Sequence, residues 1–123
     1  MTALQRISPE APAVLCKALF NSTNYLGLTQ AELGQIIGVD RTTVTRLKQK
    51  GNLDPGSKPG ELAGCLIRIF RGLYALMGGD AAAIQHWMST FNHHLNGRPI
   101  EMIQHPQGLI QVLVYLDALR GKI

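Results

Sequence analysis

The stretch TQAELGQIIGVD, residues 29–40, sets the strongest limit on how this 123-residue chain can fold. Thr29 and Glu32 have the spacing of a capping box, in which a hydroxyl and a carboxylate occupy backbone amides at the start of a helix. Gly38 stands where a left-handed residue would end that helix, and Asp40 can cap a second helix after a single intervening residue. Two short helices joined so tightly must cross steeply, which is the outline of a helix-turn-helix.

Helix signals continue on both sides of this stretch. Ser8 followed by Pro9 predicts a helix start, and apolar residues at helical spacing extend from there to about residue 23. Residues 51–60, GNLDPGSKPG, are rich in turn formers and predict a boundary between two lobes. Beyond them, an apolar seam at steps of four and three predicts a helix that ends at Gly78. The seam consists of Leu62, Leu66, Ile69, Leu73 and Leu76.

Two further helices are expected towards the C-terminus. Asp80 can cap the first of them. Its apolar residues are Ile84, Trp87, Met88 and Phe91. Pro106 opens a last helix that is apolar around most of its circumference, which predicts packing partners on two sides, within the fold or in a dimer. Because no strand-like alternation persists, the sequence predicts an all-α protein with a helix-turn-helix lobe at 1–58 and a small helical lobe at 59–123.

The composition limits the class of protein. Hydrophobic residues make up 46% of the chain, which is enough for one core or for two small lobes sharing one. The net charge of +4 is uneven, since residues 1–58 hold seven Lys and Arg against four Asp and Glu, and residues 59–123 hold five against four. This excess predicts a polyanionic partner for the first half. Without an apolar run of about 18 residues or a secretory signal, a cytoplasmic protein that does not contact membranes is expected.

Residues 40–50, DRTTVTRLKQK, indicate which surface would meet that partner. The three threonines and the valine are middling helix formers, so a helix selected only for packing would not favour them. At about 100° per residue, six polar side chains fall within roughly 160° of arc, with Val44 and Leu47 in the opposite sector. The six are Arg41, Thr42, Thr45, Arg46, Lys48 and Gln49.

This face suits the reading of DNA. Arginine can form paired bonds to guanine, threonine can bond a base or contact the thymine methyl, and lysine neutralises phosphate. In a helix-turn-helix the second helix enters the major groove by its N-terminal end, where the first arginine and the threonines lie. The predicted DNA-binding residues are Arg41, Thr42, Thr45, Arg46 and Lys48, with Gln30 and Thr43 at phosphates. The alternative is a charged face that is simply solvated.

Two segments resemble known families. The stretch LTQAELGQIIGVDRTTVTRL, residues 28–47, looks like the Xre/Cro-type helix-turn-helix of phage repressors. In the second half, Trp87 precedes a distinctive polar segment, and Gly108 precedes a Val- and Leu-rich helix. The polar segment contains Asn92, Leu95, Gly97, Arg98 and Pro99. This order resembles the C-terminal toxin-binding domain of the Xre/MbcA/ParS antitoxin family, and the two resemblances together cover most of the chain.

The resemblance implies that the protein neutralises a RES-type toxin, an enzyme that degrades NAD, by lodging its C-terminal domain over the toxin's active-site cleft. It also implies repression of its own operon, and a two-fold operator predicts a homodimer. The toxin-binding residues carried over are Asn92, Leu95, Gly97, Arg98 and Pro99, although each except Arg98 could equally shape the turn. Where many relatives have Gly-Gly, this chain has Asn96-Gly97, and asparagine tolerates a left-handed conformation. Arg120 and Lys122 could reach a partner's pocket.

Other chemistry is not predicted. The histidines lack Cys or carboxylate partners at ligand spacing, so no metal site is expected. They are His86, His93, His94 and His105. No nucleophile and base can be paired, so neither an enzyme nor a cofactor is expected. Cys16 and Cys65 are interpreted as buried free thiols, and Trp87 as a core residue. The competing functions are a free-standing dimeric repressor, whose second lobe dimerises or senses a small ligand, and an adaptor with a degenerate motif.

Overall fold

The computed structural model describes residues 9–121, which form seven α-helices. They are α1 (Ala11–Leu26), α2 (Gln30–Ile37), α3 (Arg41–Lys50), α4 (Lys58–Leu76), α5 (Ala81–Ser89), α6 (Pro99–Met102) and α7 (Pro106–Leu119). The extended structure recorded in these residues is an isolated antiparallel bridge between Asn92 and Gly97. The predicted all-α class is therefore confirmed.

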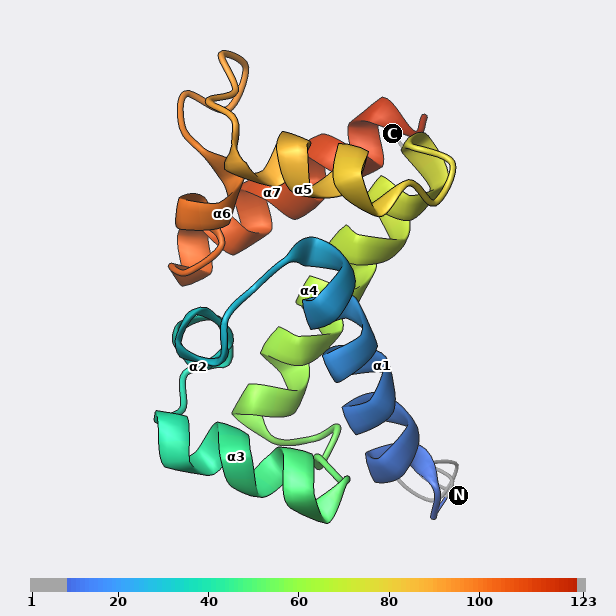
Figure 1. The fold of residues 1–123 in the computed structure, drawn as a ribbon, viewed down its shortest axis with the longest axis vertical. Helices are drawn as coiled ribbons and strands as arrows, with labels where there is room; N and C mark the ends of the chain where they lie inside the picture. The colour runs from blue at the N-terminus through green and yellow to red at the C-terminus, as the bar shows by residue number, and fades with distance from the viewer. Residues whose placement is uncertain (1–8, 122–123) are drawn as a thin grey trace.

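The long helix α4 runs through the middle of the molecule and contacts helices from both halves of the chain (Figure 1). α1 packs along it, α2 and α3 lie at one end, and α5, α6 and α7 lie at the other. The helix-turn-helix and the C-terminal helices thus pack on a common central helix.

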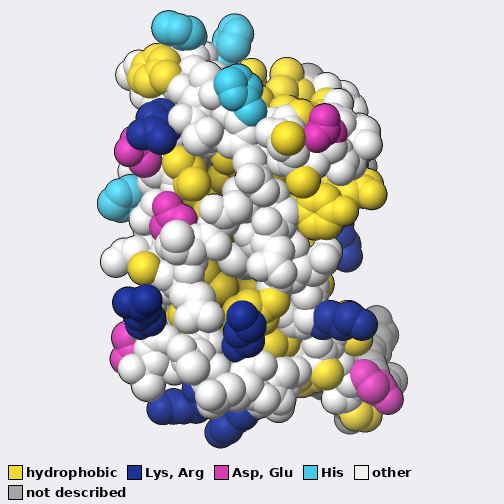
Figure 2. Space-filling view, in the orientation of Figure 1, with side chains coloured by type: hydrophobic (Ala, Val, Ile, Leu, Met, Phe, Trp, Pro, Cys, Tyr) yellow, Lys and Arg dark blue, Asp and Glu magenta, His cyan; other side chains and the backbone are white. Residues whose placement is uncertain are grey.

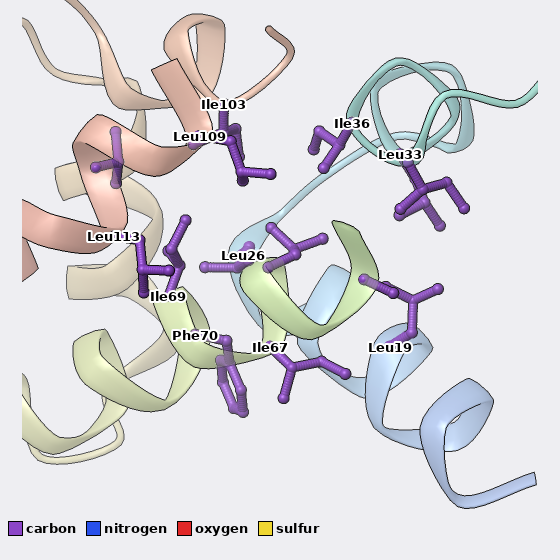
Figure 3. Close-up of a cluster of buried hydrophobic side chains, with 14 of the residues drawn as sticks. Leu19, Leu26, Leu33, Ile36, Ile67, Ile69, Phe70, Ile103, Leu109 and Leu113 are labelled. Carbon is purple, nitrogen blue, oxygen red and sulfur yellow. The ribbon is translucent and has the colours of Figure 1, made fainter. Parts of the chain in front are cut away.

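One hydrophobic core runs through both halves. Leu19 of α1 and Leu33 of α2 belong to the same buried cluster as Ile69 of α4 and Leu109 of α7 (Figure 3). The largest fully buried side chains are Leu19, Leu26, Leu33, Ile37, Leu66, Ile69, Leu73, Ile84, Met88, Ile103, Leu109 and Leu116. Because α4 contributes to the core along its length, removing either half of the chain would expose apolar surface of the other half.

The helix signals of the sequence are formed in the structure. The Thr29 hydroxyl accepts a bond of 3.1 Å from the amide of Glu32, whose carboxylate accepts one of 2.8 Å from the amide of Thr29. Gly38 ends α2 with φ 75°. Asp40 caps α3 and Asp80 caps α5 through their carboxylates. These local predictions are confirmed.

The ends of two helices differ from the prediction. α1 begins at Ala11 with Pro12 in its first turn, while Ser8 lies outside the described residues. The same helix extends to Leu26, because Gly27, at φ 74°, is the left-handed residue that ends it. α4 begins at Lys58, within the stretch expected to be turn, since the Ser57 hydroxyl accepts from the amide of Gly60 and caps the helix.

Two apolar residues expected in the core lie on the surface. Leu76 is 43% exposed because it is the last residue of α4, and Phe91 is 48% exposed because α5 already ends at Ser89. Among residues 9–121, no helix is by itself long and apolar enough to cross a bilayer, and only α4 and α5 taken together, across a bend of 119°, would have the length and composition.

Candidate functional site

α3 is held in place by its apolar side. Val44 is buried in the core and Leu47 is half-buried against it. The thiol of Cys16 on α1 donates a hydrogen bond of 3.4 Å to the backbone oxygen of Leu47. This burial raises the pKa of the Cys16 thiol above its usual value, so the group stays protonated and able to donate.

The turn that aims α3 depends on a close approach of backbone to backbone. The amide of Val39 donates to the oxygen of Gly34 at 2.9 Å. A Cβ added to Gly34 would lie 2.8 Å from the Val39 oxygen and 3.5 Å from a methyl of Val44. Only a residue without a side chain lets α2 and α3 pack this closely.

The opposite side of α3 faces outward. The exposed side chains are those of Arg41, Thr42, Thr45, Arg46, Lys48, Gln49 and Lys50. None of the ion pairs between described side chains involves a cation of α3. Lys and Arg side chains gather at the end of the molecule where α2 and α3 lie (Figure 2). The structure therefore brings together the predicted polar face as one accessible surface, which we call the α3 face.

Three of the predicted DNA-binding residues are less free than the rest. Gln30 is the first residue of α2 and is half-buried, and Thr43 is half-buried beside the cap. The hydroxyl of Thr45 donates to the backbone oxygen of Arg41 at 3.2 Å. Its methyl group and the acceptor side of its hydroxyl remain available to a ligand.

Asp40 places a carboxylate at the N-terminus of α3, beside the α3 face. Its carboxylate accepts a 2.8 Å bond from the amide of Thr43. Hydrogen bonding from Thr43 lowers the pKa of Asp40, and the positive charge of Arg46 lowers it further. The carboxylate is therefore ionised at neutral pH and stabilises the N-terminus of α3.

The polar segment after α5 forms a tight hairpin turn. The Asn92 amide donates to the Gly97 oxygen at 2.8 Å, and the Gly97 amide donates back at 3.2 Å. The side-chain oxygen of Asn92 accepts from the amide of Leu95 at 3.0 Å. Asn96 has φ 58°, so this asparagine adopts the left-handed conformation expected for it. Asn92 and Gly97 thus define the shape of the turn.

Arg98 and Pro99 fix the turn to its neighbours. The Arg98 Nε donates to the backbone oxygen of Ser89 at 2.9 Å, and its Nη1 lies 3.3 Å from Glu101. Pro99 is buried and opens α6. Leu95 is half-buried and packs against the core. Arg120 lies against α4 at Gly72, and Lys122 is outside the described residues. The predicted toxin-binding residues are therefore not gathered into one exposed surface.

A different set of side chains, exposed or half-buried, forms an apolar surface beside this turn. The ring of Trp87 stacks on that of Tyr115, with centroids 6.5 Å apart and an angle of 16°. Tyr115 also stacks on His94, at 6.1 Å. Ile110 and Val114 lie beside them on α7 and are exposed. We call this surface the α5–α7 patch; it consists of Trp87, Phe91, His94, Ile110, Val114 and Tyr115.

Two hollows make the α5–α7 patch concave. One, of about 490 Å³, is lined by Trp87 and Phe91 together with Met77, Asn92 and nearby residues in and just after α5. The other, of about 620 Å³, is lined by His94, Leu95 and the exposed side of α7. Trp87, expected in the core, is half-buried and contributes one face to the first hollow. Sequence reasoning missed these contacts, although the apolar circumference of α7 predicted a second packing partner.

Residues 9–121 contain no group of three His, Cys, Asp or Glu side chains placed to hold a metal ion. Cys16 is buried and Cys65 half-buried, and both are free thiols.

The capped helix pair and the exposed α3 face define a DNA-binding protein of the helix-turn-helix class. Residues 5–68 match the antitoxin Xre-like helix-turn-helix domain, and residues 72–122 match the antitoxin Xre/MbcA/ParS C-terminal toxin-binding domain. The chain belongs to the Xre-like helix-turn-helix antitoxin family, whose domains are non-enzymatic. A comparison with curated proteins gives no significant match.

Most of the exposed large apolar side chains lie in the region matched to the toxin-binding domain. Among residues 9–121, seven large apolar side chains are exposed, and six of them lie within the toxin-binding match. They are Tyr74, Leu76, Phe91, Ile110, Val114 and Leu119, and the seventh is Val14.

The two matched regions meet inside α4, whereas the lobe boundary expected between residues 58 and 59 falls in its first turn. That division into lobes stays a prediction.

Proposed function

We propose that this antitoxin neutralises a RES-type, NAD-degrading toxin by binding it directly, and that it represses its own operon. The toxin-binding match over residues 72–122 supports direct binding. The choice of a RES-type toxin rests on the resemblance of the segment from Asn92 to Pro99 to the Xre/MbcA/ParS family. We place the protein in the cytoplasm, where an operator and a NAD-degrading enzyme would both be met.

The observation that carries the toxin-binding proposal is the exposed α5–α7 patch. Exposed apolar surface that is hollowed and rimmed by polar residues is typical of protein interfaces, and Trp and Tyr are enriched there. Asn92, Gly97, Arg98 and Pro99 contribute by holding the turn beside this patch, with Leu95 lining one hollow. Arg120 and Lys122 would add cationic contacts at the end of the chain.

The test is co-expression with the product of the neighbouring gene. If that product is a RES-type toxin, it lowers cellular NAD and stops growth, and the full antitoxin restores both. Val114→Glu, which places a charge in the patch, is expected to abolish the rescue. Val14→Glu is the matched control, because it makes the same change on α1. Val14 is 63% exposed, against 60% for Val114. Loss of rescue in both variants, or an unchanged NAD level with the toxin alone, contradicts the proposal.

For DNA we propose that a homodimer binds a two-fold operator through the α3 face. One helix-turn-helix reads a half-site, and two-fold DNA is commonly met by a two-fold protein. The contacts proposed are bases for Arg41, Thr42, Thr45 and Arg46, and phosphates for Gln30, Thr43 and Lys48. The test is titration of the upstream DNA of the operon against a shuffled duplex of equal length. Two chains per operator are expected, and equal affinity for both duplexes contradicts operator reading.

A free-standing dimeric repressor is the second candidate, and the exposed side of α7 is the observation that favours it. In that protein Ile110 and Val114 would bury against a second copy of the chain. Val114→Glu would then dissociate the dimer in the absence of any toxin, which sedimentation of the purified chain measures. If Val114→Glu leaves the monomer–dimer equilibrium unchanged, the α5–α7 patch is not the dimer interface and is available to a different protein.

A further inference from the structure

Three arginines gather where α4 meets the end of α7, apart from the α3 face and the α5–α7 patch. Arg68 and Arg71 stand three residues apart on α4, and Asp117 and Arg120 stand three apart at the end of α7. Their side chains line a hollow of about 190 Å³. Arg120 lies along α4, with its Cδ 3.6 Å from the position that a Cβ of Gly72 would take.

The charges of this hollow are not balanced. Arg68 Nη2 lies 3.0 Å from Asp117 Oδ2, which is the ion pair of the hollow. Arg71 and Arg120 form no ion pair with any described side chain. Three guanidinium groups and one carboxylate leave a net charge of +2 among these four residues. Like charges one turn apart on a helix repel each other, so an anion between them would lower the free energy of the fold.

We propose that this hollow binds a phosphate group carrying two negative charges, either inorganic phosphate or the phosphate monoester of a small metabolite. A phosphate monoester carries about −1.5 to −2 charge at pH 7, which matches the hollow. Guanidinium groups offer paired donors to phosphate oxygens. The hollow is smaller than the roughly 300 Å³ at which pockets begin to enclose whole small molecules, so the phosphate group enters while the rest of a metabolite stays outside.

The hollow lies between the two regions of the chain that match different family domains. Arg68 lies in the region matched to the helix-turn-helix domain, and Asp117 and Arg120 lie in the region matched to the toxin-binding domain. A phosphate held between them ties α4 to α7 and stabilises the folded state by mass action. Phosphate binding in this hollow requires neither a particular toxin nor a particular operator.

The test is a titration of the full-length protein with sodium phosphate, using sodium chloride at equal ionic strength as the reference. The NMR signals of the arginine side-chain Nε–H groups report the site. Saturable shifts are expected for Arg68, Arg71 and Arg120, together with a rise in Tm. Arg71→Gln and Arg120→Gln are each expected to weaken binding about tenfold, the scale of one charge-assisted hydrogen bond.

Two further variants decide whether the hollow itself is responsible. Lys58→Gln removes one charge from a side chain that is 85% exposed and outside the hollow, and it should leave the affinity unchanged. Asp117→Asn should strengthen binding, because it removes the competing carboxylate and frees Arg68. Shifts that do not saturate, or an equal loss in Lys58→Gln and Arg71→Gln, overturn the proposal.

Three probes distinguish the sources of the phosphate. Inorganic phosphate and AMP test the free ion and the monoester, and tighter binding of AMP assigns the site to a nucleotide monoester. Dimethyl phosphate, a diester with a single charge, should bind more weakly than either. Equal binding of dimethyl phosphate and inorganic phosphate would show that the hollow does not select a dianion, contrary to the proposal.

Discussion

At the residue scale, Arg46 and Lys48 are expected to contribute to DNA binding in different ways. Arg46→Ala should cost about 1–3 kcal/mol of operator affinity and relax the preference for one base pair, because arginine reads a base edge. Lys48→Ala should weaken operator and random DNA alike and lower the slope of log K against log salt by about 1, because lysine neutralises one phosphate. Affinities measured at several salt concentrations separate the two effects.

The control for both variants is Lys17→Ala, which removes a cation from the exposed side of α1. It should change neither the specificity nor the salt slope by as much as the α3 variants do. An Arg46→Ala protein that keeps the full preference for operator over random DNA would remove Arg46 from the reading surface.

Asp40 gives the stability of α3 a predictable dependence on pH. Its pKa is lowered in the folded state, so its stabilising effect is present above the unfolded value of about 4 and is lost as the pH falls through the folded value. Asp40→Ala should therefore be less stable than the native chain at pH 7, and the difference should shrink below about pH 4. Urea unfolding at both pH values measures this; a difference that persists in acid contradicts it.

At the element scale, the junction of α2 and α3 depends on Gly34. Gly34→Ala should lower the free energy of unfolding by about 1–3 kcal/mol, because the new Cβ would press on the backbone oxygen of Val39. Gly64→Ala is the matched control in the middle of α4, where an added Cβ meets nothing within 4 Å. That change should raise stability by about 0.5–1 kcal/mol.

Thermal or urea unfolding of the two variants gives the comparison. Gly34→Ala is expected to lower the free energy of unfolding, and Gly64→Ala is expected to raise it. If Gly34→Ala also stabilises the protein, then the close approach of α2 and α3 is not what fixes the direction of the α3 face.

The helix starts and ends could be predicted from the sequence because they depend on side chains only a few residues away. Thr29, Gly38, Asp40 and Asp80 each satisfy backbone groups of their own turn. The α3 face could be predicted for the same reason, since its polar and apolar sectors follow from the helical period. The starts of α1 and α4 could not be predicted as well. Pro12, and not Pro9, lies in the first turn of α1, and Ser57 caps α4 inside a stretch rich in turn formers.

The C-terminal surface could not be predicted to the same extent. α7 is apolar around most of its circumference, so its sequence does not say which side packs on α4 and which side is exposed. The structure buries Leu109 and Leu116 and exposes Ile110 and Val114. Hydrogen bonds of the hairpin turn, such as that from Arg98 to Ser89, join residues whose contact depends on the tertiary fold.

At the scale of the whole molecule, the two surfaces lie at opposite ends of the central helix α4 (Figure 1). The α3 face is at one end, and the helices that form the α5–α7 patch are at the other. Because both ends share one core, we expect them to unfold together. Point substitutions such as Val114→Glu therefore test each surface better than truncation, which would expose buried residues of α4.

The central claim is that DNA and the toxin occupy these separate surfaces on one folded chain. The most direct measurement is the mass of the complex formed when operator DNA, antitoxin and toxin are mixed. A complex that contains all three is expected, and Arg46→Ala should lose only the DNA from it while Val114→Glu should lose only the toxin. Mutual displacement of operator and toxin, or loss of both partners in either variant, would contradict the account.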